Sequence, residues 1–148
     1  MNTTKDAVPA RTGTLAALRN LGRVPAKSMY AMRRIATKQA DLLGQLLPGS
    51  ALHVPTQVTS IFPAVVVESV ARLPVSGISY WANRQWHIHV REDDPADERA
   101  FTILHQLKKI IDHPVRRAST AFSDADWEIL ARHFAGRVLA REAIVVPV

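Results

Sequence analysis

The side chains that could do chemistry in this chain include six histidines and thirteen acidic residues, and the chain contains no cysteine. A metal ion would therefore have to be held by His, Asp, Glu or backbone oxygen, and a thiolate-zinc site or a cysteine nucleophile is excluded. His87 and His89 alternate on one face of a predicted strand, and such a His-x-His pair can bind a metal ion. The alternative is a pair that faces solvent or a helix, opposite Trp86, Ile88 and Val90.

Two other kinds of reactive site are not indicated. The candidate serine nucleophiles lie in no recognisable nucleophile elbow; they are Ser76, Ser79 and Ser119. The six glycines are scattered and form no phosphate-binding loop. Covalent serine catalysis and nucleotide binding are therefore not predicted.

The sequence predicts helical structure before a small sheet. A long amphipathic helix is expected from Ala26 to Leu47, with Pro25 before its start and Pro48-Gly49 as its stop. A shorter helical segment from Thr14 to Leu21 precedes it. Residues 1–25 are expected to be disordered or a short basic segment, with one domain over residues 26–148.

A sheet and two more helices are predicted in the second half of the chain. Residues 64–70 read as a buried strand, and residues 78–82 and 85–90 read as a hairpin around Asn83-Arg84. A helix is expected from about Asp97 to Ile111, ended by Pro114, and another from the N-cap Ser123 to about Arg141. The predicted class is α+β, a small sheet with three or more packed helices.

The net charge of +6 lies entirely in the first 44 residues, which hold eight Lys or Arg against two acids. Its main part is a basic patch on the long helix, formed by Lys27, Arg33, Arg34 and Lys38. Such a patch leaves nucleic acid or an acidic partner open as a ligand, and a merely solvated face is the alternative.

Three segments of the chain carry a resemblance to a known family. They are LPVSGISYWANRQWHIHV at residues 73–90, ERAFTILHQLKKIIDHP at residues 98–114 and WEILARHFAGRVL at residues 127–139. In this order they resemble the hairpin, the H-E-x-x-H helix and the E-x-x-A-x-x-F-A helix of the ImmA/IrrE family of metallo-endopeptidases. The resemblance runs from about residue 26 to the C-terminus and implies a zincin-like metallopeptidase fold.

The resemblance also implies a set of site residues. In the family, two histidines at i and i+4 bind one zinc, the glutamate beside the first activates the metal-bound water, and the next helix supplies a third ligand. By resemblance His105 and Glu128 keep the first and third ligand positions. Gln106 stands at the general-base position and Lys109 at the second ligand position.

Both departures are expected to disable the zinc site. A lysine binds metal only as the free amine, and holding it deprotonated at neutral pH costs roughly 4.6 kcal/mol. A glutamine has no useful basicity, and losing a general base typically costs about 10²- to 10⁴-fold in rate. His113 and His133 are not expected to substitute, because each points to another side of its helix.

The sequence therefore predicts a catalytically inactive binding or regulatory module, with no cofactor expected, or zinc if the site still functions. The resemblance implies a protein partner, such as a transcriptional repressor or another regulator of a mobile element. Two alternatives stay open: an active zinc endopeptidase that cleaves a repressor, and a basic nucleic-acid-binding domain. A cytoplasmic protein without membrane contact is expected, since no apolar run approaches roughly 18 residues and no signal peptide is evident.

Lys109 is predicted to take the structural place of the metal. It lies one turn after His105 on the same helix face, and its long side chain could reach Glu128. A partly buried carboxylate without a cationic partner would be unfavourable. We therefore expect the Lys109 ammonium within about 4 Å of the Glu128 carboxylate, with Gln106 donating to nearby polar groups.

Overall fold

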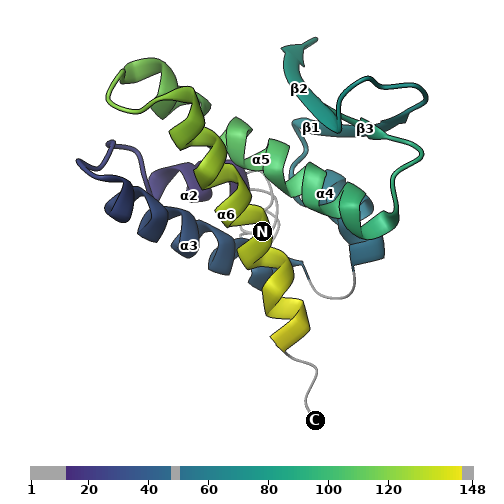
Figure 1. Cartoon of the computed structure of the whole chain (residues 1–148), viewed down its shortest axis with the longest axis horizontal. Helices are drawn as coiled ribbons and strands as arrows, with labels where there is room; N and C mark the ends of the chain where they lie inside the picture. The colour runs from purple at the N-terminus through teal and green to yellow at the C-terminus, as the bar shows by residue number, and fades with distance from the viewer. Residues whose placement is uncertain (1–12, 48–50, 145–148) are drawn as a thin grey trace, which may run out of the picture.

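The longest helix in the described part of the chain, α5 (Ala96–Ala118), separates the sheet from most of the other helices (Figure 1). The computed structural model describes residues 13–47 and 51–144. Along the chain the other elements are α2 (Thr14–Asn20), α3 (Met29–Leu46), η1 (Ala51–His53), α4 (Val54–Ile61), β1 (Val65–Val70), β2 (Gly77–Ala82), β3 (Gln85–Arg91) and α6 (Asp124–Ile144). The α+β class and the small sheet are therefore confirmed.

The sheet has three strands in the order β1-β3-β2, with β1 parallel and β2 antiparallel to the central strand β3. The predicted hairpin is confirmed to within one residue. Its turn residues Asn83 and Arg84 both have positive φ, 54° and 61°, the backbone that a two-residue hairpin turn requires. Ile88 and Val90 of β3 are buried against α5, so the alternate residues of β3 lie on the opposite face.

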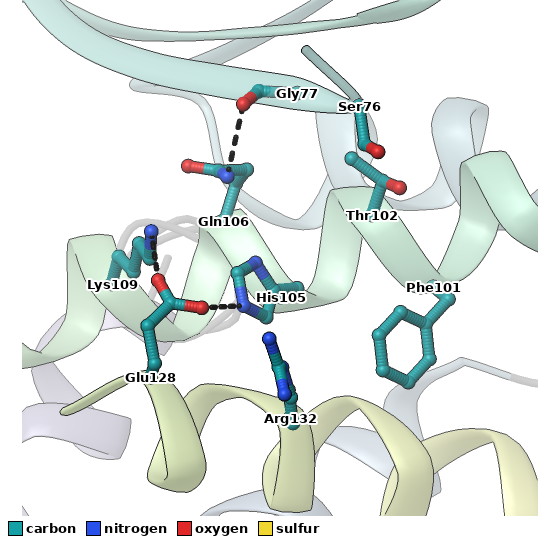
Figure 2. A pocket seen from close by; sticks show the side chains of 9 residues that line it. All are labelled: Ser76, Gly77, Phe101, Thr102, His105, Gln106, Lys109, Glu128 and Arg132. Atoms are coloured by element: carbon teal, nitrogen blue, oxygen red, sulfur yellow. Dashed lines mark hydrogen bonds and ion pairs between the residues drawn. The ribbon is translucent and has the colours of Figure 1, made fainter. Parts of the chain in front are cut away.

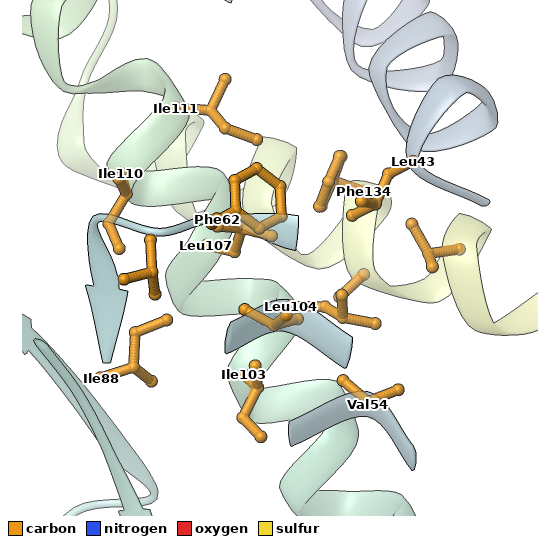
Figure 3. Packing of buried hydrophobic residues seen from close by; sticks show 14 of the residues in the cluster. Leu43, Val54, Phe62, Ile88, Ile103, Leu104, Leu107, Ile110, Ile111 and Phe134 are labelled. Carbon is orange, nitrogen blue, oxygen red and sulfur yellow. The ribbon is translucent and has the colours of Figure 1, made fainter. Parts of the chain in front are cut away.

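The core is built around one apolar stripe of α5, which contacts β3, α4 and α6 (Figure 3). The stripe consists of Ile103, Leu104, Leu107, Ile110 and Ile111, each at most 1% exposed. Phe62, which follows α4, and Phe134 of α6 pack against it. Because this stripe holds α5 in place, the polar side chains on its other face are positioned as well.

The helix predicted to end before Pro114 continues for four residues beyond it, to Ala118. Proline has no N–H to donate to the carbonyl four residues earlier, which normally weakens or ends a helix. Here that carbonyl, of Ile110, accepts a hydrogen bond of 2.7 Å from Nη2 of Arg19. Nε of Arg19 also donates to the carbonyl of Ile111 at 3.3 Å. The partner from α2 thus offsets the bond that Pro114 removes.

The packed structure extends upstream of residue 26, the predicted start of the domain. The helix α2 matches the predicted segment from residue 14, and its Leu18 is completely buried in the core. The long helix α3 begins at Met29, three residues later than predicted, because Ser28 caps it by accepting from the N–H of Ala31. The predicted stop at Pro48-Gly49 lies outside the described residues.

The short helix α4 was not predicted. Pro55 occupies its first turn, where the missing N–H costs nothing. Strand β1 and helix α6 begin within one residue of their predicted starts. The cap predicted at Ser123 is also present, since its Oγ accepts from the N–H of Asp126 at 3.1 Å.

Candidate functional site

Helices α5 and α6 bring His105, Lys109 and Glu128 together in one cleft of about 300 Å³ (Figure 2). His105 and Lys109 lie one turn apart on α5 and both point toward Glu128 of α6. The wall opposite α6 is formed by the start of β2. The cleft is also lined by Ser76, Gly77, Phe101, Thr102, Gln106 and Arg132.

Both oxygens of the Glu128 carboxylate are engaged by α5. Nε2 of His105 lies 2.8 Å from Oε2, and the Lys109 ammonium forms an ion pair with Oε1. The ion pair predicted between Lys109 and Glu128 is therefore confirmed, and the bond from His105 adds a second contact. These side chains clamp α5 to α6 at the mouth of the cleft, where Lys109 is 31% and Glu128 36% exposed.

The surroundings of His105 and Glu128 determine their protonation states. Burial lowers the pKa of His105 below its usual 6.5, Glu128 opposes this shift, and Lys109 and Arg132 add to it. Burial would raise the pKa of Glu128, but hydrogen bonds from Lys109 and His105 outweigh it, so the net shift is downward. At neutral pH a neutral His105 thus donates its Nε2–H to an ionised carboxylate, which can only accept.

Gln106 faces the sheet and ties α5 to β2. Its Oε1 accepts from Oγ of Ser79 at 2.9 Å, and its Nε2 donates to the carbonyl of Gly77 at 3.4 Å, as expected for an amide with polar neighbours. The side chain is buried, and both ends of its amide have hydrogen-bond partners within the protein. Gly77 lets β2 lie this close to α5, because a Cβ there would lie 2.3 Å from Cγ2 of Thr102.

The residues at this site do not fit the zinc that the resemblance implies. Nε2 of His105 is bonded to Glu128, so a metal there would have to displace this hydrogen bond and its proton. The carboxylate has a donor on each oxygen, and the ammonium of Lys109 adds a positive charge where a cation would bind. Gln106 offers only an amide that is already bonded to β2. Zinc binding would require rebuilding this arrangement.

The remaining histidines of these two helices lie elsewhere, as predicted. His113 packs edge-on against Trp86, with ring centroids 5.0 Å apart. Nε2 of His133 lies 2.7 Å from Oγ1 of Thr37, between α6 and α3. Neither lines the cleft.

The sequence prediction missed Phe101 and Arg132, which both line the cleft. Phe101 stacks near His105, with ring centroids 6.3 Å apart, and Arg132 helps to lower the pKa of His105. Each stands four residues from a predicted site residue on the same helix. That spacing, which places side chains on one face, was the available signal.

The basic patch is exposed and lies outside the cleft. Lys27 precedes α3, while Arg33, Arg34 and Lys38 belong to that helix. A nucleic-acid or acidic ligand for this patch stays a prediction.

Comparison of the chain with models of protein families, with curated proteins and with solved structures finds no match. The family resemblance therefore rests on the three segments quoted from the sequence. Among the described residues, no helix is long and apolar enough to cross a membrane.

Replacing Lys109 by methionine is expected to lower the free energy of unfolding by about 1 to 2 kcal/mol at pH 7, between values typical of exposed and buried ion pairs. The substitution should also raise the pKa of Glu128, because the bond from Lys109 lowers it. Carboxyl chemical shifts and urea unfolding across pH would measure both effects.

The pH dependence of the Lys109 effect has a defined sign. Because folding lowers the pKa of Glu128, its stabilisation is present above the ordinary value of 4.5 and is lost as the pH falls through the folded value. The difference between wild type and Lys109→Met should shrink over that acidic range. The exposed Lys38→Met serves as a control and should change stability by less than about 0.5 kcal/mol. An unchanged difference at low pH would contradict the assigned pairing.

Proposed function

We propose that this chain is an ImmA/IrrE-like, zincin-related domain whose zinc centre has been replaced by an ion-pair cluster and that acts as a non-catalytic binding module. The observation that carries the proposal is the engagement of both Glu128 oxygens by His105 and Lys109. A metal site needs free lone pairs at these atoms, and water activation needs a base where Gln106 stands. The cluster preserves the link between α5 and α6 without the ion.

The charge of the cleft favours an acidic partner segment. With His105 neutral, Lys109 and Arg132 against Glu128 leave a net charge of +1 in the cleft. Arg132 is exposed and lines the cleft on the side of α6, and polar Ser76 lines the opposite wall. The partner we propose is a protein of the cytoplasm, a repressor or another regulator, that presents a carboxylate to this cleft.

Restoring the family's residues should restore metal binding. The double variant Gln106→Glu with Lys109→His would supply a second imidazole and remove the opposing charge, so its zinc affinity at this site should rise by more than about 100-fold. Gln106→Glu alone should leave zinc affinity low, because Lys109 still occupies Glu128. Competition with a chromogenic chelator measures both, in a His89→Ala background that removes the histidine pair of β3.

Two results would count against this proposal. One is a single variant, Gln106→Glu, that binds zinc as tightly as the double variant. The other is a full equivalent of zinc in wild-type protein, measured by mass spectrometry, that disappears on His105→Ala. The second result would favour the alternative of an active zinc endopeptidase built on His105 and Glu128.

A further inference from the structure

A second cluster of metal-binding side chains lies on the face of the sheet opposite the core. His87 and His89 alternate with the buried residues Ile88 and Val90 along β3. Glu68 of β1 is the register partner of His89, so its side chain shares the face of the two histidines. The sheet therefore brings a carboxylate from one strand beside two imidazoles from the next.

The three ligand atoms, one from each residue, lie within 4.8 Å of one another. Nε2 of His89 is 3.5 Å and Nδ1 of His87 is 3.9 Å from the same Oε1 of Glu68. Ligands of a tetrahedral zinc ion, at bonds of about 2.0 to 2.1 Å, are spaced roughly 3.3 Å apart. The two distances to Glu68 exceed that spacing by about 0.2 and 0.6 Å, and Glu68, which is 55% exposed, has room to move. The widest separation exceeds it by about 1.5 Å, which the two histidine side chains would close by moving under about 1 Å each.

One nitrogen of this cluster is buried without a hydrogen-bond partner. Nε2 of His87 lies 3.0 Å from the carbonyl oxygen of Ala82, which can only accept, so Nε2 carries a proton. In a neutral ring Nδ1 then bears a lone pair, and this atom is buried without a partner. The lone pair and the carboxylate of Glu68 are both acceptors, and a cation between them would satisfy both.

Neighbouring groups orient the two histidine rings. Tyr80 of β2 stacks on the ring of His87 at 4.9 Å and meets His89 edge-on at 5.2 Å. A metal-binding histidine usually donates its other N–H to a carbonyl or carboxylate, which sets the tautomer and the orientation, and the bond from His87 to Ala82 does this. The Tyr80 hydroxyl also lies 3.2 Å from Nε2 of His89, and an ion bound at that nitrogen would displace this contact. The cluster thus has supporting contacts to His87 that are already formed.

We propose that Glu68, His87 and His89 form a binding site for a divalent transition-metal ion, with zinc as the reference ion. Two imidazoles with one carboxylate suit zinc and its neighbours in the first transition row, whereas calcium and magnesium prefer oxygen ligands. Three protein ligands leave a coordination position for water at the exposed side of the cluster. The site is separate from the cleft of His105 and does not depend on the proposed function.

The test is a zinc titration of the full-length, tag-free chain after chelator treatment. Wild-type protein should bind one equivalent, and His87→Ala and Glu68→Gln should each weaken binding by more than about 100-fold, since even outer partners of metal ligands account for 10- to 100-fold. Glu68→Gln alters an exposed side chain, so the fold should be retained. Cobalt substituted for zinc should give the absorption of a low-symmetry site, and nitrogen shifts should identify Nδ1 of His87 as the ligand.

Two control variants locate the ion. His53→Ala removes an exposed histidine outside the cluster, and His105→Ala removes the histidine of the cleft; both should leave zinc affinity within about twofold of wild type. Absence of zinc binding to wild-type protein at micromolar concentration would overturn the inference. Binding that survives both His87→Ala and Glu68→Gln would overturn it too. Binding lost only in His105→Ala would overturn this site and the proposed function together.

Discussion

Replacing Asp112 by alanine is expected to lower the free energy of unfolding by about 3 to 5 kcal/mol, the cost of leaving a buried charge unpaired. Asp112 accepts a hydrogen bond of 2.5 Å from the ammonium of Lys108, whose side chain is 1% exposed. Burial lowers the pKa of Lys108, and the attraction of Asp112 opposes that shift. Without Asp112 the lysine must lose its proton or draw water into the core. Urea unfolding monitored by circular dichroism measures the loss.

A double variant separates the cost of an unpaired charge from the value of the pair. Lys108→Met with Asp112→Leu removes both charges and keeps apolar volume, so it should recover most of the stability lost by Asp112→Ala. The exposed pair of Arg116 and Asp124 is a matched control, because Asp124→Ala should cost less than about 1 kcal/mol. A double variant as unstable as Asp112→Ala would show that the ion pair itself stabilises α5. The loss in Asp112→Ala would then not come from the unpaired charge of Lys108.

Replacing Arg19 by methionine is expected to cost about 1 to 3 kcal/mol, because it leaves a helix carbonyl without a partner. Arg19 donates to the carbonyls of Ile110 and Ile111. Pro114 has no N–H to donate to the carbonyl of Ile110. Unfolding in urea would measure the change. The exposed Arg23→Met is the control and should stay within about 0.5 kcal/mol of wild type.

The effect of Arg19 should depend on the proline. In a Pro114→Ala background the new N–H can donate to Ile110, so Arg19→Met should cost at least about 0.5 kcal/mol less than in wild type. Equal costs in the two backgrounds would contradict this account. The stabilisation would then come from the attraction between Arg19 and Asp112.

Much of the secondary structure is determined by local sequence. The hairpin follows from Asn83 between two apolar runs, because asparagine readily adopts the left-handed backbone of a two-residue turn. The start of α6 follows from Ser123, whose side chain satisfies a free N–H of the first turn. These signals act over a few residues and do not need the rest of the fold. The pairing of Lys109 with Glu128 was also predicted, because the family resemblance places both residues at one metal site.

Other features were decided only by tertiary contacts. The sequence around Pro114 predicts the end of a helix, and only the guanidinium of Arg19, about ninety residues away, supplies the partner that lets α5 continue. The role of His105 likewise depends on α6, since its bond to Glu128 decides which nitrogen carries the proton.

The sequence by itself determined that His87 and His89 share a face, because side chains of a strand alternate with a period of two. The sequence could not predict that Glu68 lies beside them, nor that Nδ1 of His87 has no hydrogen-bond partner. The parallel register of β1 with β3 decides the first, and the bond from His87 to Ala82 decides the second. Strand register and hydrogen-bond partners arise from packing between distant segments, whereas alternation and turns arise from the local backbone.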